Sequence, residues 1–262
     1  MSSNNYLCKN NDISNKKHKF TFILYSTEWL TRTEMLIGKE NQEKLRSSHV
    51  LVAGLGGVGA YSAEMLCRAG IGKLTLVDGD TVQHNNRNRQ LLALRSNENR
   101  PKTEVMAERL RDINPDVQLE LINEFIRDER LIEIISQPCD YVVDAIDTLS
   151  PKIFLIFYAL KNNQRIVSSM GAGGKLDPLQ IRVDDLSQTY NCRLAYILRK
   201  RLRKLGVTTG VKAVFSTEQT DKNLVKTCDE QNKKSVVGTI SYLPAMFGCV
   251  CAAVAIRDII GQ

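Results

Sequence analysis

Short apolar runs alternate with longer stretches of helical periodicity through the middle of the chain. The runs that we expect to form strands are 49–54, 74–78, 119–122, 141–145 and 166–168. Apolar residues at helical spacing lie between them at 58–68 and 103–113, and an earlier helical region covers 29–45. Continuous apolar runs are typical of strands buried on both faces, and strands that alternate with helices form parallel sheets. The pattern therefore predicts an α/β fold with a mainly parallel sheet and flanking helices.

The two ends of the chain depart from this alternation. We expect a disordered tail over 1–27, because residues 1 to about 19 are rich in Asn, Ser and Lys and have too little apolar surface to offset the entropy of ordering. We expect 28–185 to form the core domain and 186–262 to form a C-terminal extension. Inside the extension, 218–235 is polar and rich in lysine, which predicts a mobile surface insertion.

An apolar segment closes the chain. Residues 236–256 are 21 positions without a charge, long enough to cross a bilayer. Gly238, Pro244 and Gly248 interrupt the segment, and the remainder of the chain is typical of a cytoplasmic α/β domain. We therefore expect an apolar tail helix in the core or in a dimer interface without stable membrane insertion, and membrane association is the alternative.

A glycine-rich turn joins the first core strand to the helix after it. Gly54, Gly56, Gly57 and Gly59 stand where glycines let the backbone approach phosphates at a helix N-terminus. Asp78 ends the next strand, where a carboxylate can accept hydrogen bonds from ribose hydroxyls. This combination predicts a nucleotide site in a Rossmann-like fold, and by itself it suits NAD as well as ATP.

Positive charge follows Asp78 and favours ATP. The loop 85–90 reads NNRNRQ and includes Asn86 and Arg89, and Lys102 opens the next predicted helix. Attack on the α-phosphate of ATP needs concentrated positive charge, which a dehydrogenase does not need. Asp147 follows another strand, at the edge where such a sheet binds its ligands, and could hold Mg²⁺ between phosphates.

Together these residues resemble the ubiquitin-activating-enzyme superfamily of adenylating enzymes over about 29–260. The resemblance implies that 28–185 is an ATP-binding adenylation core and that 186–262 makes substrate and dimer contacts. It implies roles for the residues above: the four glycines form the ATP turn, Asp78 binds ribose, and Asn86, Arg89 and Lys102 engage phosphates. It further implies that Asp147 binds the metal, and that the protein is a homodimer in which Arg32 enters the active site of the other subunit.

Longer motifs resemble one branch of that superfamily, the bacterial tRNA threonylcarbamoyladenosine dehydratases. They are AIDTLSPK at 145–152, GAGGKLDP at 171–178 and VFSTE at 214–218. The resemblance implies ATP-dependent cyclisation of threonylcarbamoyladenosine in tRNA to a hydantoin through an acyl-adenylate. Adenylation of the C-terminus of a ubiquitin-like sulfur carrier is the alternative, although the two Cys-x-x-Cys pairs usual in those relatives do not occur. An NAD-binding oxidoreductase and a nucleotide-binding scaffold are the other rivals. A sulfur-transfer partner and a monovalent cation stay open.

The net charge of +7 is concentrated in one place. Between 193 and 212 there are seven basic residues and no acidic one, and apolar residues in the first part recur at helical spacing. We expect a helix over about 192–205 with an apolar side in the core and a basic side outside. Its basic side would either be ordinary solvated surface or bind the phosphates of tRNA, and the candidates for that contact are Arg199, Lys200, Arg203 and Lys204.

The seven cysteines form no evenly spaced framework, and no apolar signal segment opens the sequence. Both observations favour a reducing cytoplasm. Because the expected nucleophile belongs to the substrate, we expect no cysteine to be required for cyclisation.

Overall fold

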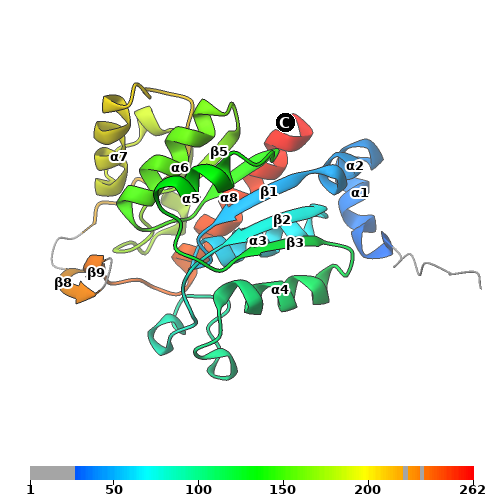
Figure 1. Cartoon of the computed structure of the whole chain (residues 1–262), viewed down its shortest axis with the longest axis horizontal. Helices are drawn as coiled ribbons and strands as arrows, with labels where there is room; N and C mark the ends of the chain where they lie inside the picture. Colours follow the sequence, from blue (N-terminus) through cyan, green and yellow to red (C-terminus); the bar gives the residue numbers. More distant parts are fainter. Residues whose placement is uncertain (1–26, 221–223, 231–232) are drawn as a thin grey trace, which may run out of the picture.

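The computed structural model describes residues 27–220, 224–230 and 233–262. The predicted tail at 1–27 lies outside the described residues except for Thr27. Seven strands form one sheet in the order β3-β2-β1-β4-β5-β7-β6 (Figure 1). Every neighbouring pair is parallel except β6 and β7. The strands are β1 (His49–Ala53), β2 (Lys73–Val77), β3 (Gln118–Ile122), β4 (Tyr141–Asp144), β5 (Arg165–Ser169), β6 (Ile181–Asp185) and β7 (Lys212–Ser216). The predicted α/β fold is confirmed.

Helices cover both faces of the sheet, and each face has its own hydrophobic cluster. The first cluster lies under α3 (Gly59–Arg68), α4 (Lys102–Ile113) and α8 (Tyr242–Ile260), and the second under α5 (Asp128–Ile135), α6 (Leu149–Lys161) and α7 (Arg193–Lys204). β1 illustrates the arrangement, because Val50 and Val52 join the first cluster while Leu51 and Ala53 join the second. Successive side chains of a strand point to opposite faces, so a strand buried on both sides must be apolar throughout.

The N-terminal helical region is broken. The single stretch expected at 29–45 forms the 3-10 helix η1 (Thr27–Leu30), α1 (Thr31–Ile37) and α2 (Lys39–Ser47). Gly38 separates α1 from α2 with a φ of +82°, a conformation that favours glycine and that a helix cannot contain. No apolar residue occurs between Ile37 and Leu45, so the glycine was the signal for the break.

The insertion predicted at 218–235 contains regular structure. β8 (Val225–Glu230) and β9 (Lys233–Val237) pair antiparallel in a separate two-stranded sheet. The sequence here is polar and rich in lysine, so it lacks the alternation of apolar residues that would have indicated strands. The four remaining elements are short 3-10 helices: η2 (His84–Asn86), η3 (Arg95–Asn97), η4 (Pro178–Gln180) and η5 (Leu186–Gln188).

The C-terminal extension is built into the same sheet and core. β7 lies between β5 and β6, and α8 packs on α3, β4 and β5. By length and composition alone α8 could cross a membrane, but 44% of its 18-residue apolar stretch is buried inside the protein. Near its C-terminus Asp258 accepts a hydrogen bond from the Tyr141 hydroxyl at 2.6 Å and pairs with Lys212 of β7 at 2.5 Å. α8 is thus a core helix of the α/β unit.

Candidate nucleotide-binding site

The carboxyl ends of β1, β2 and β4 meet at one edge of the sheet (Figure 1). β1 is the central strand of the three, and the chain passes from it to β2 on one side and later to β4 on the other. Ligands of open α/β sheets bind where the strand order reverses in this way. The glycine turn follows β1, Asp78 follows β2 and Asp147 follows β4, so the topology brings these three features to the same edge.

Close packing explains three of the four glycines of the turn. A Cβ added to Gly59 would lie 1.7 Å from the carbonyl oxygen of Gly54, and one added to Gly57 would lie 2.9 Å from Cβ of Pro244 in α8. Gly54 has a φ of +88°, and its added Cβ would lie 2.8 Å from the carbonyl oxygen of Ala145. Gly56 is different, because the nearest atom to its added Cβ is 3.8 Å away. The space left at Gly56 is where a ligand can approach the backbone.

Asp78 fastens the turn to the end of β2. Its carboxylate accepts hydrogen bonds from the backbone N–H of Leu55 at 2.6 Å and from that of Asp80 at 2.8 Å. Burial raises the pKa of this carboxyl group, and the ammonium of Lys102 and both backbone donors oppose the rise. A ribose hydroxyl would therefore meet a carboxylate that two backbone donors already hold in place.

Lys102 lies at this edge because the two ends of the preceding loop, 81–101, are joined to each other. Thr81 and Pro101 form an isolated bridge, and the Lys102 N–H donates to the carbonyl oxygen of Asp80 at 3.1 Å. Lys102 is 4% exposed, and its Nζ lies 2.9 Å from the Asp80 carboxylate, whose side chain is half exposed. The ammonium is thus fixed at the carboxyl edge of the sheet, and a buried, oriented cation would stabilise phosphoryl charge more strongly than a solvated one. Sequence reasoning identified Lys102 but missed Asp80 as its partner.

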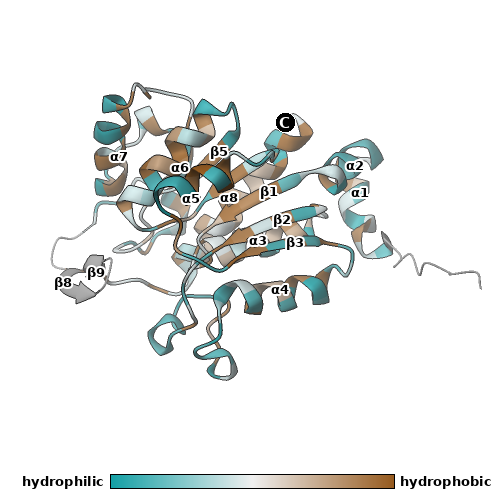
Figure 2. Ribbon diagram, viewed as in Figure 1, coloured by the Kyte–Doolittle hydropathy of each residue, from teal (hydrophilic) through white to brown (hydrophobic). Residues whose placement is uncertain are grey.

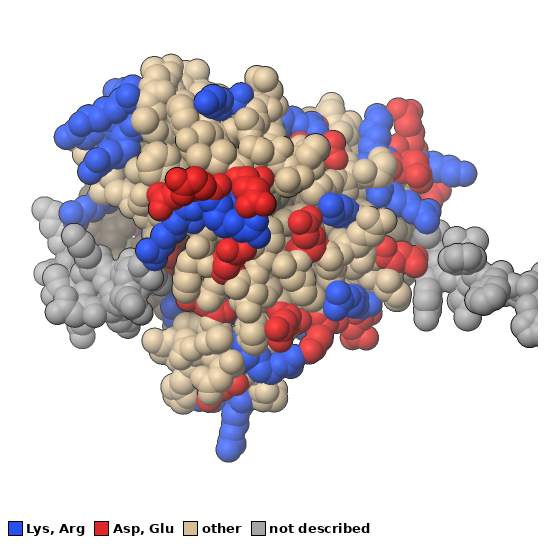
Figure 3. Space-filling view, viewed as in Figure 1, with Lys and Arg blue, Asp and Glu red and all other residues tan. Residues whose placement is uncertain are grey.

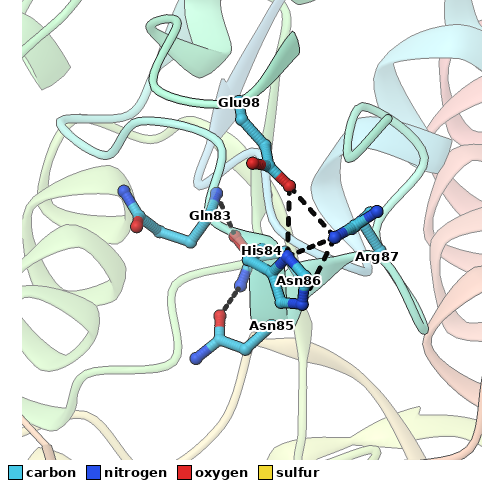
Figure 4. Close-up of polar contacts among 6 residues, drawn as sticks. All are labelled: Gln83, His84, Asn85, Asn86, Arg87 and Glu98. Carbon is cyan, nitrogen blue, oxygen red and sulfur yellow. Dashed lines mark hydrogen bonds and ion pairs between the residues drawn. The ribbon is translucent and has the colours of Figure 1, made fainter. Parts of the chain in front are cut away.

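The polar loop after β2 is held together by its own side chains (Figure 4). Asn86 is buried, and its Oδ1 accepts a hydrogen bond from the Gln83 N–H at 3.2 Å while its Nδ2 donates to Asn85 at 2.9 Å. Arg87 contacts His84 and pairs with Glu98 at 3.2 Å. The structure therefore gives Asn86 a role in shaping the loop and engages Arg87 within it.

Two other residues of the same loop orient Arg89. Its Nη1 donates to the carbonyl oxygen of Asn85 at 2.9 Å and to Oδ1 of Asn88 at 2.8 Å. Asn88 in turn donates from Nδ2 to the carbonyl oxygen of Thr239 at 3.0 Å, which ties the loop to the segment between β9 and α8. Next along the chain, Oε1 of Gln90 is buried and has no hydrogen-bond partner among the described residues. An unpaired buried acceptor beside Gly56 fits a site that a ligand completes.

The loop that carries Asp147 rests on a buried ion pair that sequence reasoning missed. Nζ of Lys152 lies 2.7 Å from Oδ2 of Asp144, and both side chains are fully buried. Lys152 also donates to the carbonyl oxygen of Ile146 at 3.1 Å, and the Ser168 hydroxyl donates to Asp144 at 2.6 Å. Asp147 itself is exposed at the edge of the sheet. The signals in the sequence were a charged residue at the end of an otherwise apolar strand and Lys152 at the end of the motif at 145–152.

The donor set at this edge fits Mg²⁺ carried by ATP. The described part of the chain contains no group of three or more His, Cys, Asp and Glu residues that could hold a metal ion alone. Mg²⁺ usually takes one or two protein carboxylates together with substrate phosphates and water. Asp147 offers one exposed carboxylate at the carboxyl edge of the sheet, which suits that requirement.

Comparison with known proteins decides the family. The family model described as the ThiF family matches residues 30–262. The chain belongs to the ThiF family. Within it, the chain is 42% identical to the tRNA threonylcarbamoyladenosine dehydratase of Bacillus subtilis (strain 168) over 188 residues, which cover 72% of this chain and 74% of that protein. It is 38% identical to the Escherichia coli (strain K12) dehydratase over 261 residues, which cover 92% and 97% of the two chains.

A solved structure of a ThiF-family relative has the same fold. The crystal structure of the E. coli tRNA N6-threonylcarbamoyladenosine dehydratase in complex with ATP superposes with a TM-score of 0.82 at 37% identity. The superposition covers 91% of this chain and 98% of the E. coli chain. The shared architecture therefore includes the C-terminal extension as well as the nucleotide edge.

Arg32 lies away from the nucleotide edge of this ThiF-family chain. It is exposed on α1, directly after η1, whose Leu30 lies against Gly70 just before β2 begins. That position is at the amino ends of the strands, opposite the glycine turn (Figure 1). The single chain thus does not bring Arg32 together with Arg89, Lys102 and Asp147.

The basic helix is present as α7. Ala195, Leu198 and Leu202 are buried against the core, and the opposite side is polar (Figure 2). Figure 3 shows Lys and Arg side chains gathered over this helix, and Lys200, Arg203 and Lys204 are exposed. Arg199 differs from the other candidates, because it is half buried and its Nη1 donates to the carbonyl oxygen of Thr189 at 2.8 Å. Arg199 anchors the helix and has less of its guanidinium available to a partner.

Proposed function

We propose that this chain is an ATP-dependent tRNA threonylcarbamoyladenosine dehydratase, which cyclises threonylcarbamoyladenosine in tRNA to its hydantoin form. One observation carries the proposal: the chain matches the E. coli dehydratase over 97% of that protein, and the E. coli structure holds ATP. The edge that gathers the glycine turn, Asp78 and Lys102 supports it, because these groups suit the phosphates and ribose of ATP.

The proposed reaction has two steps, and ATP drives it. A carboxylate is a poor acyl electrophile, so an oxygen of the threonyl carboxylate first attacks the α-phosphate and pyrophosphate leaves. The urea nitrogen of the same modification then attacks the acyl carbon, loses its proton and expels AMP, which closes the five-membered ring with a net loss of water. The second step is intramolecular and needs no nucleophile from the protein.

The side chains at the edge of the sheet have the following roles in this proposal. The glycine turn and Asp78 hold the phosphates and ribose, and Asn86 keeps the phosphate loop in shape. Arg89 and Lys102 stabilise the charge that develops on the α-phosphate and on the leaving pyrophosphate. Mg²⁺, held by Asp147, would neutralise phosphate charge during attack. Each subunit would supply Arg32 to the site of the other subunit in a cytoplasmic homodimer.

The test is a direct comparison of substrates. Purified protein is given ATP and either tRNA bearing threonylcarbamoyladenosine or a ubiquitin-like sulfur carrier, and AMP, pyrophosphate and the nucleosides of digested tRNA are measured. We expect AMP and the hydantoin nucleoside to form in equal amounts, and only with modified tRNA. AMP joined to the carrier C-terminus, without hydantoin, would replace this proposal with sulfur-carrier activation. No pyrophosphate exchange with either substrate would exclude adenylation altogether.

A further inference from the structure

The outward side of α7 combines an exposed aromatic ring with cations. Tyr196, Lys200 and Arg203 follow one another at intervals of four and three residues, so they lie along one side of the helix. The Tyr196 residue is 58% exposed. A surface depression is lined by these three side chains together with Arg199. We call Tyr196, Lys200 and Arg203 the outer face of α7.

The outer face is held on a fixed support. Ala195 and Leu198 are fully buried, and α7 packs against α6. Arg199 fastens the helix to the preceding loop, since its guanidinium donates to both the carbonyl oxygen and the hydroxyl of Thr189. Side chains that project from an anchored helix lose less conformational freedom on binding than side chains of a loose loop.

The charge of the outer face is available to a partner. α7 carries six basic residues and no acidic one, namely Arg193, Arg199, Lys200, Arg201, Arg203 and Lys204. Among the ion pairs between described residues, none involves a residue of this helix. Uncompensated positive charge on one face attracts a polyanion.

We propose that the outer face of α7 binds an unpaired stretch of RNA, with one base stacked on the ring of Tyr196 and adjacent phosphates on Lys200 and Arg203. Phosphates alone need only cations, whereas a ring exposed among cations offers a surface for the face of a base. Bases in a duplex are stacked on one another and hide those faces, so a duplex cannot use the ring. The inference rests on the proposed function, because it assigns to this face an unpaired part of the tRNA substrate.

Three RNA probes test the proposal by fluorescence anisotropy with the full-length protein. They are a single-stranded oligoadenylate, the same strand in a duplex with oligouridylate, and an abasic ribose-phosphate strand of equal length. We expect the oligoadenylate to bind more tightly than both other probes. Equal affinity for all three would overturn the proposal and leave a face that binds phosphates alone.

Substitutions then separate the ring from the cations. Tyr196→Leu should weaken oligoadenylate binding by about 5- to 150-fold without changing the slope of log K against log salt, while Tyr196→Phe should bind normally. Lys200→Gln and Arg203→Gln should each reduce that slope by about 0.7. Phe154→Leu and Lys161→Gln on the neighbouring helix α6 are the matched controls and should change neither quantity. Normal oligoadenylate affinity in Tyr196→Leu would exclude stacking on this ring.

The test separates this inference from the proposed function. Tyr196→Leu should raise the KM for modified tRNA and leave kcat at saturating tRNA and pyrophosphate exchange near the wild-type values. A wild-type protein that binds oligoadenylate through Tyr196 yet forms no hydantoin would contradict the proposed function alone. A protein that forms hydantoin with the same KM in the Tyr196→Leu variant would contradict this inference alone.

Discussion

Asp144 and Lys152 place two opposite charges in the interior, directly beneath the loop that carries Asp147. Removing one charge of a buried pair leaves the other without compensation, which usually costs about 3–5 kcal/mol. Lys152→Met should lower the free energy of unfolding by that amount in urea denaturation. The double variant Asp144→Asn, Lys152→Met leaves no buried charge and should recover part of the loss. If the double variant is no more stable than the single one, the pair does not act as a charge pair.

At the nucleotide edge, three charged side chains are expected to act mainly in the transition state. Arg89→Ala, Lys102→Ala and Asp147→Ala should each lower kcat by about a hundredfold or more, the scale of removing a preorganised electrostatic group. Arg95→Ala is the matched control: Arg95 is exposed in the segment between β2 and α4 that also carries Arg89, and its replacement should leave kcat unchanged. Wild-type turnover by all three variants with saturating ATP and tRNA would show that the site lies elsewhere.

Glu64 gives the molecule an acid-sensitive contact between α3 and α4. Burial alone would raise the pKa of this carboxyl group, but hydrogen bonds from Arg109 and Arg68 outweigh it and lower the pKa. A lowered pKa means that the stabilisation is present above the unfolded-state value, about 4.3, and is lost as the pH falls below it. Glu64→Gln should therefore cost about 1–2 kcal/mol at pH 7 and little in strong acid. A loss that is the same at both pH values would contradict this assignment.

At the scale of elements, the glycine turn depends on the first turn of α8. Gly57→Ala would place a Cβ against Pro244, which must shift α8 or the turn and should cost about 1–3 kcal/mol of stability. Gly56→Ala is the matched variant, because its Cβ meets nothing closer than 3.8 Å. It should unfold like the wild type yet bind ATP more weakly, since the methyl group occupies the approach to the backbone. Equal ATP affinity in Gly56→Ala and the wild type would place the nucleotide away from this turn.

The strands β1 to β5 were predicted from their apolar runs, whereas β6 and β7 were not. The strand expected at 74–78 forms at Lys73–Val77, and the one expected at 119–122 forms at Gln118–Ile122. β6 was not expected, because it is an antiparallel edge strand whose residues are mostly exposed and charged. β8 and β9 were not expected either, because their sequence is polar and rich in lysine and lacks an alternation of apolar residues.

In the candidate site, the features set by local sequence were predictable and those set by contacts between distant segments were not. The glycine turn and Asp78 are recognisable because their residues lie within one strand–turn–helix segment. Charge and family resemblance pointed to Arg89 and Lys102. The contact between Asn88 and Thr239 joins segments far apart in the sequence, and a local sequence pattern does not predict such a contact.

At the scale of the whole molecule, the proposed homodimer would complete each site with Arg32 from the other subunit. Arg32→Ala and Asp147→Ala proteins should each be inactive alone, and exchange of subunits should restore part of the activity. In a mixed dimer one of the two sites would then have both residues intact. Recovery would be measured as AMP release after mixing, with exchange verified by differently tagged subunits. Proven exchange without recovery would mean that Arg32 acts within its own subunit or not at all.

The order of the elements along the chain means that parts of the sheet and of the glycine turn are synthesised well before the segments they pack against. β6 has only β7 as a neighbour, and β7 is made after the whole of α7. The glycine turn is among the first segments of the core to be made, while Pro244, against which Gly57 packs, is among the last. A growing chain thus carries an incompletely packed glycine turn until its final helix emerges and docks. A chain that stops before α8 therefore lacks the contact between Gly57 and Pro244 that completes the packing of this turn.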